Sequence, residues 1–456
     1  MHQPGVQCTI SVRGHATAEQ AARLQAARPA TRASRKLNGT AGHHPCYFLD
    51  IFQIIDFLRS MSSPLVILIL SLLLGLQPIT TDLYLPALPA LSAGLGVAPP
   101  HAQLTLTALL LAFGASQLFW GPLSDRIGRR RVLLIGLAGY TLAAIGSALA
   151  GSIEMMVVWR TLQGAFMGAG TVCARAIVRD LYAPQEGARA MSKGLSGLGV
   201  AACLSPWIGG LLAEWFGWRA TLLALTVMGA ITLLVVLRTF RETLHERNPE
   251  ALQPAVLLRT ARGILGNRSF WTYASLCTAS FGGLFCILSA SSFVFINLLG
   301  TSPSFYGMLL LMLSAFYIVG TILCRRLILR IGVQRSVMIG GALSLSGGGL
   351  MLAFALAGAS TVWTIMVPAF IFMLGHGVHQ PCGQSGAVAP FPKAAGAASA
   401  ITGFLMMVVA FGAAHWVGAN MDGSALPMIV GVALCSAAVA FIAWVPVQRV
   451  RLGAAG

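Results

Sequence analysis

The sequence predicts an all-α membrane protein in which twelve transmembrane helices form two six-helix halves. Of its 456 residues, 56% are hydrophobic and only 9% are charged, whereas charged residues make up about 25% of a soluble domain. The apolar residues fall into runs of about 18 to 25, each long enough to cross a hydrocarbon core of roughly 30 Å as a helix. Strands of a membrane barrel would instead alternate apolar and polar residues, so the spans must be helices.

The apolar runs give the predicted spans in chain order, and a longer connection at 239–269 divides them six and six. The two halves are 61–238 and 270–448, the connection is a cytoplasmic linker that is helical in part, and 449–456 form a cytoplasmic tail. Six-helix repeats of this kind enclose a substrate cavity between them. The spans are 64–86, 102–122, 132–151, 155–178, 190–213, 219–237, 270–297, 304–327, 333–357, 361–381, 395–418 and 426–446.

A repeated pattern at the second and eighth spans indicates that the halves arose by duplication. The second span ends in GPLSDRIGRRR (121–131) and the eighth in LCRRLILRIGVQR (323–335), which aligns Gly128 with Gly332 and Arg126 with Arg330.

Residues 1–60 differ from the rest because they are rich in Arg, Ala and His and poor in acids. One interpretation is a basic, disordered cytoplasmic arm or targeting segment. The other, which we favour, is a start codon assigned too early, because Met61 leads directly into the first span.

The positions of the basic residues predict the orientation. A net charge of +17 can indicate a nucleic-acid partner. However, 21 of the 23 Lys and Arg residues after position 60 fall in or beside cytoplasmic connections if the amino end is cytoplasmic. Only Arg219 lies in a periplasmic loop and Arg160 inside a span, which is the positive-inside distribution. We therefore expect a bacterial inner-membrane protein with both termini cytoplasmic and no nucleic-acid partner.

Two charged residues lie within the predicted spans, where each costs at least about 2.5–3.5 kcal/mol at the centre of the bilayer. Asp82 and Arg160 both fall in the outer half of the membrane and can share a depth. A carboxylate there can load and release a proton, with the arginine holding it ionised in one state. The alternatives are an inert ion pair, or an Asp82 solvated at the lipid–water boundary.

The connection between the second and third spans is short and charged. Gly121 and Gly128 permit a close helix approach and a tight turn, Asp125 can pair with Arg126 or receive a helix amino terminus, and Arg129 to Arg131 anchor the cytoplasmic face. We predict a latch between the halves, with topology-setting charge as the alternative. Further contacts of this cytoplasmic gate are expected from Arg175, Arg179 and Asp180.

The fifth span is dense in glycine and contains Pro206 beside Gly209 and Gly210. Bare backbone lets neighbouring helices pack closely, and a proline removes a backbone hydrogen bond. The pattern predicts a hinge beside the cavity, or plain packing.

The tenth span contains GHGVHQP, which places His376, His379 and Gln380 at i, i+3 and i+4. These side chains could relay protons or bind substrate from the cavity wall. Histidines satisfied within the core are the alternative, and two histidines without a third ligand do not make a zinc site.

No other chemistry is indicated. The nine cysteines lack metal or redox spacing and are expected to be packing residues. The sequence has no HExxH, GxSxG or Walker loop, so we expect neither an enzyme nor an ATP-driven pump, and no cofactor or metal.

These segments together resemble the major facilitator superfamily, and within it the twelve-helix drug:proton antiporters of the Bcr/CflA group. The resemblance runs from about Ser62 to Val447, and five motifs carry it in the right order: TDLYLPALPAL (81–91), GPLSDRIGRRR (121–131), RTLQG (160–164), ARAIVRDLY (174–182) and LSPWIGG (204–210).

The resemblance implies alternating access, with proton influx driving export of an amphiphilic compound. Asp82 would be a proton-coupling carboxylate with Arg160 as its partner, Asp125 and Arg126 parts of the latch, and Pro206, Gly209 and Gly210 the antiporter hinge. Tyr84 and Gln163, inside two of these motifs, are expected to line the cavity. Two residues depart from the pattern. Ser205 replaces the usual Gly, and Leu329 stands where the second half would match Asp125, so we expect the latch to be asymmetric.

We therefore expect a monomeric, proton-driven exporter of drugs or other small amphiphilic molecules, whose partners are its substrate, protons and the lipid bilayer. The first alternative is an exporter of a metabolite such as an amino acid, nucleoside, sugar or siderophore on the same scaffold. The second is a membrane sensor or enzyme that transports nothing.

Overall fold

The computed structural model describes residues 63–182, 184–244 and 246–450. The predictions for residues 1–60 and for most of the tail lie outside these residues. Among the described residues the first half contains seven helices and a 3₁₀ turn. They are α3 (Ser63–Asp82), η1 (Leu85–Ala87), α4 (Leu88–Gly94), α5 (Pro99–Ile127), α6 (Arg129–Ala148), α7 (Ile153–Leu181), α8 (Pro184–Phe216) and α9 (Trp218–Thr239).

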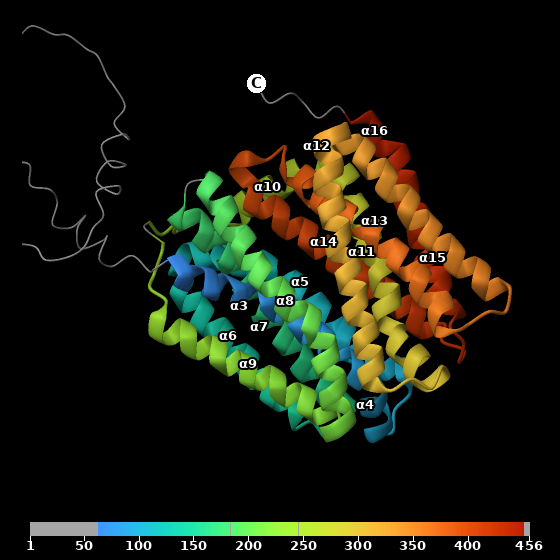
Figure 1. Ribbon diagram of the computed structural model, residues 1–456. Coiled ribbons are helices and arrows are strands. Elements are labelled where there is room, and N and C mark those ends of the chain that lie inside the picture. The colour runs from blue at the N-terminus through green and yellow to red at the C-terminus, as the bar shows by residue number, and fades with distance from the viewer. Residues whose placement is uncertain (1–62, 183, 245, 451–456) are drawn as a thin grey trace, which may run out of the picture. The chain divides into compact units, whose positions relative to one another are not determined.

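The second half follows a linker that itself contains a helix, α10 (Pro254–Leu265). Figure 1 shows the helices up to α9, in blue to yellow-green, on one side, and those from α11 onward, in yellow to red, on the other. The second-half elements are α11 (Arg268–Ser292), η2 (Phe293–Leu298), α12 (Pro303–Leu356), α13 (Val362–Val388), η3 (Pro392–Ala394), α14 (Ala395–Ala419), α15 (Leu426–Trp444) and α16 (Pro446–Arg449).

The described part of the chain has nine helices that are long and apolar enough to cross a membrane. One of them, α12, is two helices joined at Gly332, where the backbone leaves helical geometry. The 29-residue α7 and the 33-residue α8 are also long, although α7 includes Arg160 and Gln163. With α7, α8 and the second part of α12, residues 63–450 contain twelve long helical segments where the structure describes them, so the predicted all-α membrane fold is confirmed.

Side chains at the helix starts explain several boundaries. Ser152, Asn267 and Ser302 each accept a hydrogen bond from a backbone N–H in the first turn of α7, α11 and α12. Thr361 and Thr364 form a reciprocal capping box at the start of α13. Each cap satisfies backbone donors that the helix cannot pair internally.

The duplicated pattern has a structural counterpart. Gly128 separates α5 from α6 with φ of 103°, and Gly332 interrupts α12 with φ of 81°. Both angles lie in the region that favours glycine. The aligned glycines therefore make the same sharp turn in the two halves.

The two halves meet along two helix pairs, α5 with α14 and α8 with α12. In the α8–α12 pair the backbones nearly touch, because a Cβ on Gly210 would collide with the carbonyl of Pro303, and one on Gly307 with the carbonyl of Pro206. Glu214 continues this contact by accepting a hydrogen bond of 3.1 Å from the backbone N–H of Ser304.

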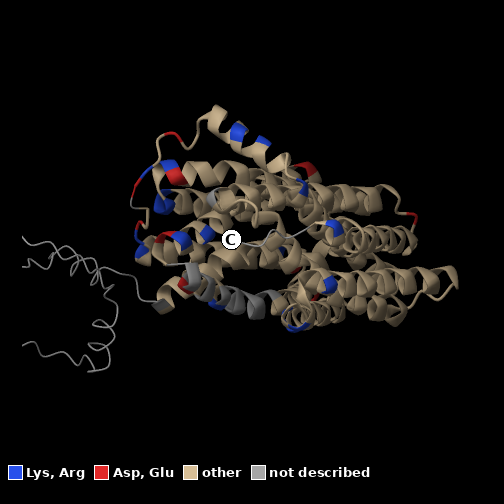
Figure 2. Ribbon diagram, turned by 90° about the horizontal axis from the view of Figure 1, so that it is seen from above, with Lys and Arg blue, Asp and Glu red and all other residues tan. Residues whose placement is uncertain are grey.

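Charged residues of the described chain lie mainly at helix ends and in the connections, and most of the ribbon of the long helices is tan (Figure 2). The exceptions inside the bundle are few, and they define the candidate site.

Candidate functional site

Asp82 is the last residue of α3, at the junction of the two halves. It is half-buried, and its carboxylate accepts a hydrogen bond of 3.0 Å from the Thr81 hydroxyl. The carbonyl of the next residue, Leu83, abuts Gly209 of α8, and the η1 turn that follows contacts both α8 and α12. Asp82 therefore lies where α3 of the first half approaches both partners of the α8–α12 contact.

Arg160 lies in α7 and is completely buried. Its guanidinium stacks over the ring of Tyr84, 4.1 Å from the ring centre, and Nη1 donates a hydrogen bond of 2.8 Å to Gln163 Oε1. Nε and Nη2 have no hydrogen-bond partner among the described residues. A buried cation with two unpaired donors is costly, so this side chain is not explained by packing alone.

Asp82 and Arg160 form no ion pair with each other in the described part of the chain. The reason is the direction in which the chain leaves α3. Tyr84, two residues after Asp82, is the side chain that packs on Arg160, whereas the Asp82 carboxylate accepts a hydrogen bond from the adjacent Thr81. The inert ion pair that was one of the alternatives is therefore not formed by the described residues in this conformation, and the coupling role of the two residues stays a prediction.

Two buried tyrosine–threonine pairs lie in the first half, and of these four residues sequence analysis named only Tyr84, the residue stacked on Arg160. Tyr84 shares a hydrogen bond of 2.7 Å with Thr105, and Tyr140 shares one of 2.7 Å with Thr80. The tyrosines and threonines are fully buried. The available signal was a polar residue inside each apolar run, since buried hydroxyls need partners.

The predicted latch is a network around Arg129, whose side chain is only 1% exposed. It binds Asp125 at 2.6 Å and Asp180 at 3.0 Å, and it donates a hydrogen bond of 2.7 Å to the Ser124 hydroxyl. Asp125 also pairs with Arg179 at 3.5 Å. Arg129 is therefore a buried residue that binds two acids. The prediction that it is an anchor at the surface was wrong.

Two other residues of the same connection also differ from expectation. Arg126 is exposed and is not among the ion-pair partners of Asp125 in the described chain. A Cβ on Gly121 would lie 3.7 Å from Val172, an ordinary contact, so no close approach requires this glycine. Gly128 does make the predicted tight turn.

The Arg129 network lies within the first half and the start of the linker. Contact with the second half comes instead from Arg175, whose Nη1 donates a hydrogen bond of 2.8 Å to the Ser399 hydroxyl of α14. Arg179 approaches Gly396 on the same helix. These two arginines thus join α7 to α14 of the second half, and their role as contacts of a cytoplasmic gate stays a prediction.

Two neighbouring glycines of α8 lie against different parts of the molecule: Gly209 against the residue after Asp82, and Gly210 against the second half. A Cβ on Gly209 would collide with the carbonyl of Leu83, the residue after Asp82, whereas Gly210 abuts Pro303 of α12. Pro206 lies one turn earlier, inside an unbroken α8. These residues bring three backbones together, and their role as a hinge stays a prediction.

The predicted cavity residues of α13 are buried and have different neighbours. His376 Nδ1 shares a hydrogen bond of 2.8 Å with the Ser280 hydroxyl, inside a cage of aromatic rings. Gln380 donates one of 2.9 Å to the Cys277 carbonyl. Neither ring nitrogen of His379 has a hydrogen-bond partner among the described residues. The first two side chains therefore face α11, whereas His379 packs beside Gly340 of α12.

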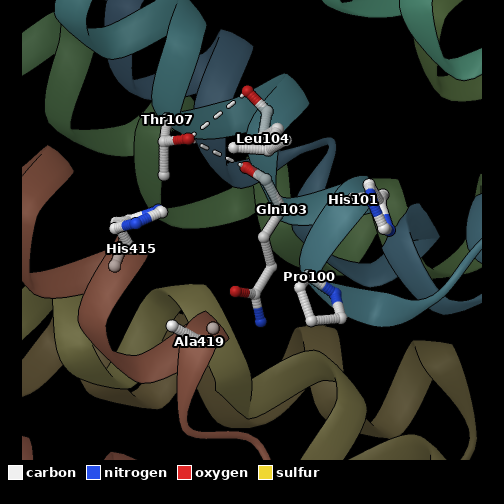
Figure 3. Close-up of a pocket in the computed structure, with 9 residues that line it drawn as sticks. Pro100, His101, Gln103, Leu104, Thr107, His415 and Ala419 are labelled. Atoms are coloured by element: carbon white, nitrogen blue, oxygen red, sulfur yellow. Dashed lines mark hydrogen bonds between the residues drawn. The ribbon is translucent and has the colours of Figure 1, made fainter.

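A pocket between α5 and α14 was not predicted (Figure 3). His101 of α5 and His415 of α14 line it, and Gln103 donates a hydrogen bond of 3.1 Å to the Met421 sulfur. Neither Asp82 nor Arg160 lines this pocket. Among the described residues there is no group of three His, Cys, Asp or Glu side chains arranged to hold a metal.

Comparisons with known proteins place this geometry in context. A sequence model described as Major Facilitator Superfamily matches residues 70–414. The chain is 32% identical over 344 residues to multidrug resistance protein D of Escherichia coli, covering 75% of this chain and 85% of the relative. It is 26% identical to the bicyclomycin resistance protein homolog of Haemophilus influenzae, over 83% and 94% of the two chains. To a chloramphenicol resistance protein of Pseudomonas aeruginosa it is 29% identical, over 70% and 75%.

Solved structures agree on the fold. The crystal structure of a D-xylose-proton symporter aligns with a TM-score of 0.65 at 15% identity, over 83% of this chain and 97% of that one. The crystal structure of a peptide transporter in complex with sulfate gives 0.66 at 15% identity, over 84% and 94%. At such identities the likeness shows the fold alone.

Proposed function

Because the chain belongs to the major facilitator superfamily, a family of multi-pass membrane transporters and not of enzymes, we propose that it exports small amphiphilic organic compounds, drugs among them, in exchange for protons. The family and the resemblance to the Bcr/CflA group predicted from the sequence are confirmed. Three relatives are named for resistance to several drugs, bicyclomycin or chloramphenicol, which supports drugs as the substrate class.

The position of Asp82 is the observation that carries proton coupling. Among the described residues its carboxylate has one hydrogen-bond donor, Thr81, and no cationic partner. An ionised carboxylate at the depth of the lipid and without a counterion is costly, and binding a proton removes that cost. Asp82 also lies where both halves meet, because the carbonyl of the next residue, Leu83, abuts Gly209 of α8, whose neighbour Gly210 abuts Pro303 of α12. A movement that opens the junction to water would hydrate the carboxylate and favour release of the proton.

Arg160 completes the proposed cycle from a neighbouring position. Its fixed positive charge means that protonation of Asp82 raises the net charge of the pair from zero to one. Its unpaired Nε and Nη2 would gain an acceptor in another state of the cycle, either the ionised Asp82 or a polar group of the substrate. Alternating access by rocking of the halves supplies such states. No cofactor other than the proton gradient is needed.

The test is gradient-driven uptake of a drug such as chloramphenicol into inverted membrane vesicles with an imposed pH difference. We expect Asp82→Asn, which cannot exchange a proton, to abolish the uptake that depends on the gradient. The matched control is Asp422→Asn, since Asp422 lies in the connection between α14 and α15 and accepts only local hydrogen bonds from Ser424. If Asp82→Asn transports like the native chain at equal protein level, the assignment of the proton site is wrong.

A further inference from the structure

The linker begins with an acid that the mechanism above does not use. The carboxylate of Glu242 accepts four backbone hydrogen bonds: from Arg129 at 2.9 Å, Arg130 at 3.1 Å, Thr243 at 3.1 Å and Leu244 at 3.1 Å. Arg129 and Arg130 are the first two residues of α6. Glu242 therefore caps α6 from a position 113 residues away in the chain, where a negative charge also stabilises the helix dipole.

The surroundings of Glu242 fit this contact closely. Gly128 has φ of 103°, and a Cβ on it would collide with the Glu242 carboxylate. The side chain of Arg130 donates hydrogen bonds to the carbonyls of Phe240 at 2.9 Å and Leu237 at 3.0 Å. The connection between α5 and α6 and the segment after α9 are therefore built to fit each other.

The same linker segment is joined to the Arg129 network at two more points. The Thr243 hydroxyl donates a hydrogen bond of 3.3 Å to Asp180, and the Asn248 backbone N–H donates one of 3.0 Å to the carbonyl of Asp125. Asp180 and Asp125 are the two acids that hold Arg129. We call residues 240–244 and 246–248 the linker anchor, because backbone and side-chain hydrogen bonds of Phe240, Glu242, Thr243 and Asn248 fix this segment to the first half.

The other end of the linker is fixed to the second half. Ile264 of α10 is 1% exposed and belongs to a cluster of buried residues with Phe270, Tyr273 and Ala398. Trp271 of α11 donates a hydrogen bond of 2.6 Å to the carbonyl of Leu265, at the end of α10. The chain from Pro254 onward therefore moves with the second half.

Only residues 249–253 lie between these two attachments. Two hydrogen bonds fold this segment into turns, from Ala251 N–H to the Asn248 carbonyl at 3.3 Å and from Gln253 N–H to the Glu250 carbonyl at 2.9 Å. Fully extended, the six steps from Asn248 to Pro254 span at most roughly 20 Å. The linker can therefore lengthen on this side of the molecule, but only to that limit.

We propose that Glu242 is a positioning residue of the transport cycle, which fixes the linker to the Arg129 network so that the linker limits how far the halves separate on their cytoplasmic side. The side is the one on which Arg175 of α7 meets Ser399 of α14. The proposal rests on the rocking motion of the proposed function but is independent of the substrate and of the driving ion.

The experiment measures the separation directly in the full chain, reconstituted in lipid without substrate or pH gradient. Spin labels are placed at Arg131→Cys, exposed in α6, and Leu329→Cys, 83% exposed in α12, in a background without other reactive cysteines. Three variants are compared with the parent by double electron–electron resonance: Glu242→Ala, a four-residue Gly-Ser-Gly-Ser insertion after Glu250, and Glu250→Gln. Glu250 is the matched control, because its side chain is exposed and forms no hydrogen bond or ion pair in the described chain.

We expect Glu242→Ala and the insertion each to extend the distance distribution, the insertion by up to about 14 Å, whereas Glu250→Gln matches the parent. The insertion keeps the cap on α6 intact, so it separates a length limit from simple loss of helix stability. An insertion that leaves the distribution unchanged overturns the proposal, even if Glu242→Ala unfolds. Because no proton gradient is applied, this result does not depend on whether Asp82 carries the proton.

Discussion

At the scale of single residues, Arg160 and Arg129 are the two largest fully buried side chains of the described residues, and they have different neighbours: Arg160 stacks on a tyrosine, whereas Arg129 is bound by two acids. Composition and span length place Asp82 and Arg160 within the predicted spans. The number of residues from the start of an apolar run gives the depth of a residue along the helix axis. The direction of a side chain around that axis depends on where α3 ends and how the chain continues through Tyr84. The packing of this segment against α7 and α8 decides the direction of each side chain. The stacking of Arg160 on Tyr84 could therefore not be predicted from the sequence.

Arg129 gives a stability prediction at this scale. Its guanidinium is bound by Asp125, Asp180 and Ser124, and removing one partner of a buried pair costs about 3–5 kcal/mol because the remaining charges are left unpaired. Asp125 is 38% exposed, so water partly screens this ion pair. We therefore expect Arg129→Ala to lower the free energy of unfolding by about 3 kcal/mol, at the lower end of that range. Arg129→Lys should recover only part of this, because an ammonium cannot bridge both acids in the same geometry.

The measurement for Arg129 is thermal unfolding of the purified protein in detergent. The neighbouring Arg131→Ala is the control, since Arg131 is exposed and forms no hydrogen bond or ion pair in the described chain. Equal melting temperatures for Arg129→Ala and Arg131→Ala would contradict the structural importance of the network.

At the scale of elements, helices were predictable and their attachments were not. Backbone groups in lipid must pair within a helix, so each long apolar run defined a span, and the eighth and ninth runs are the two parts of α12 on either side of Gly332. The linker was recognised as a connection with some helix, which α10 supplies. Its anchor at Glu242 was missed, because no local pattern reports that two segments 113 residues apart meet.

The α8–α12 contact gives a prediction at this scale. Gly210→Ala places a Cβ against the carbonyl of Pro303, and overpacking of this kind costs about 1–3 kcal/mol. Because the backbone of α12 cannot give way as a flexible side chain would, the halves must separate at this point. We expect the conformation described here to lose population by a factor of about 5 to 150, and the transport rate to fall accordingly.

The rate of drug uptake in inverted vesicles, at matched protein level, measures this effect. Gly349→Ala in α12 is the control, because a Cβ at that helical position meets no atom within 4 Å. Native transport by Gly210→Ala would mean that the close approach of α8 and α12 has no part in the cycle.

At the scale of the whole molecule, the two halves repeat one design with different chemistry. Gly128 and Gly332 make equivalent turns, as the aligned motifs predicted. The acid network, however, belongs to the first half, since Leu329 stands where Asp125 would be matched and is 83% exposed. The buried histidines belong to the second half. The sequence predicted the difference between the turns at Gly128 and Gly332 from Leu329, because a position without an acid cannot form an ion pair in any fold.

Orientation is the whole-molecule property that remains to be measured, and the arginines predict it. Positive charges are retained on the cytoplasmic side during insertion, which places the linker in the cytoplasm and the connection between α6 and α7 in the periplasm. A membrane-impermeant maleimide applied to intact cells should therefore label Gly151→Cys and spare Arg247→Cys, two exposed positions, with the native chain measuring the background of its own cysteines. Permeabilised cells should label both variants. Labelling of Arg247→Cys alone in intact cells would place the termini outside and would reverse the direction of transport proposed here.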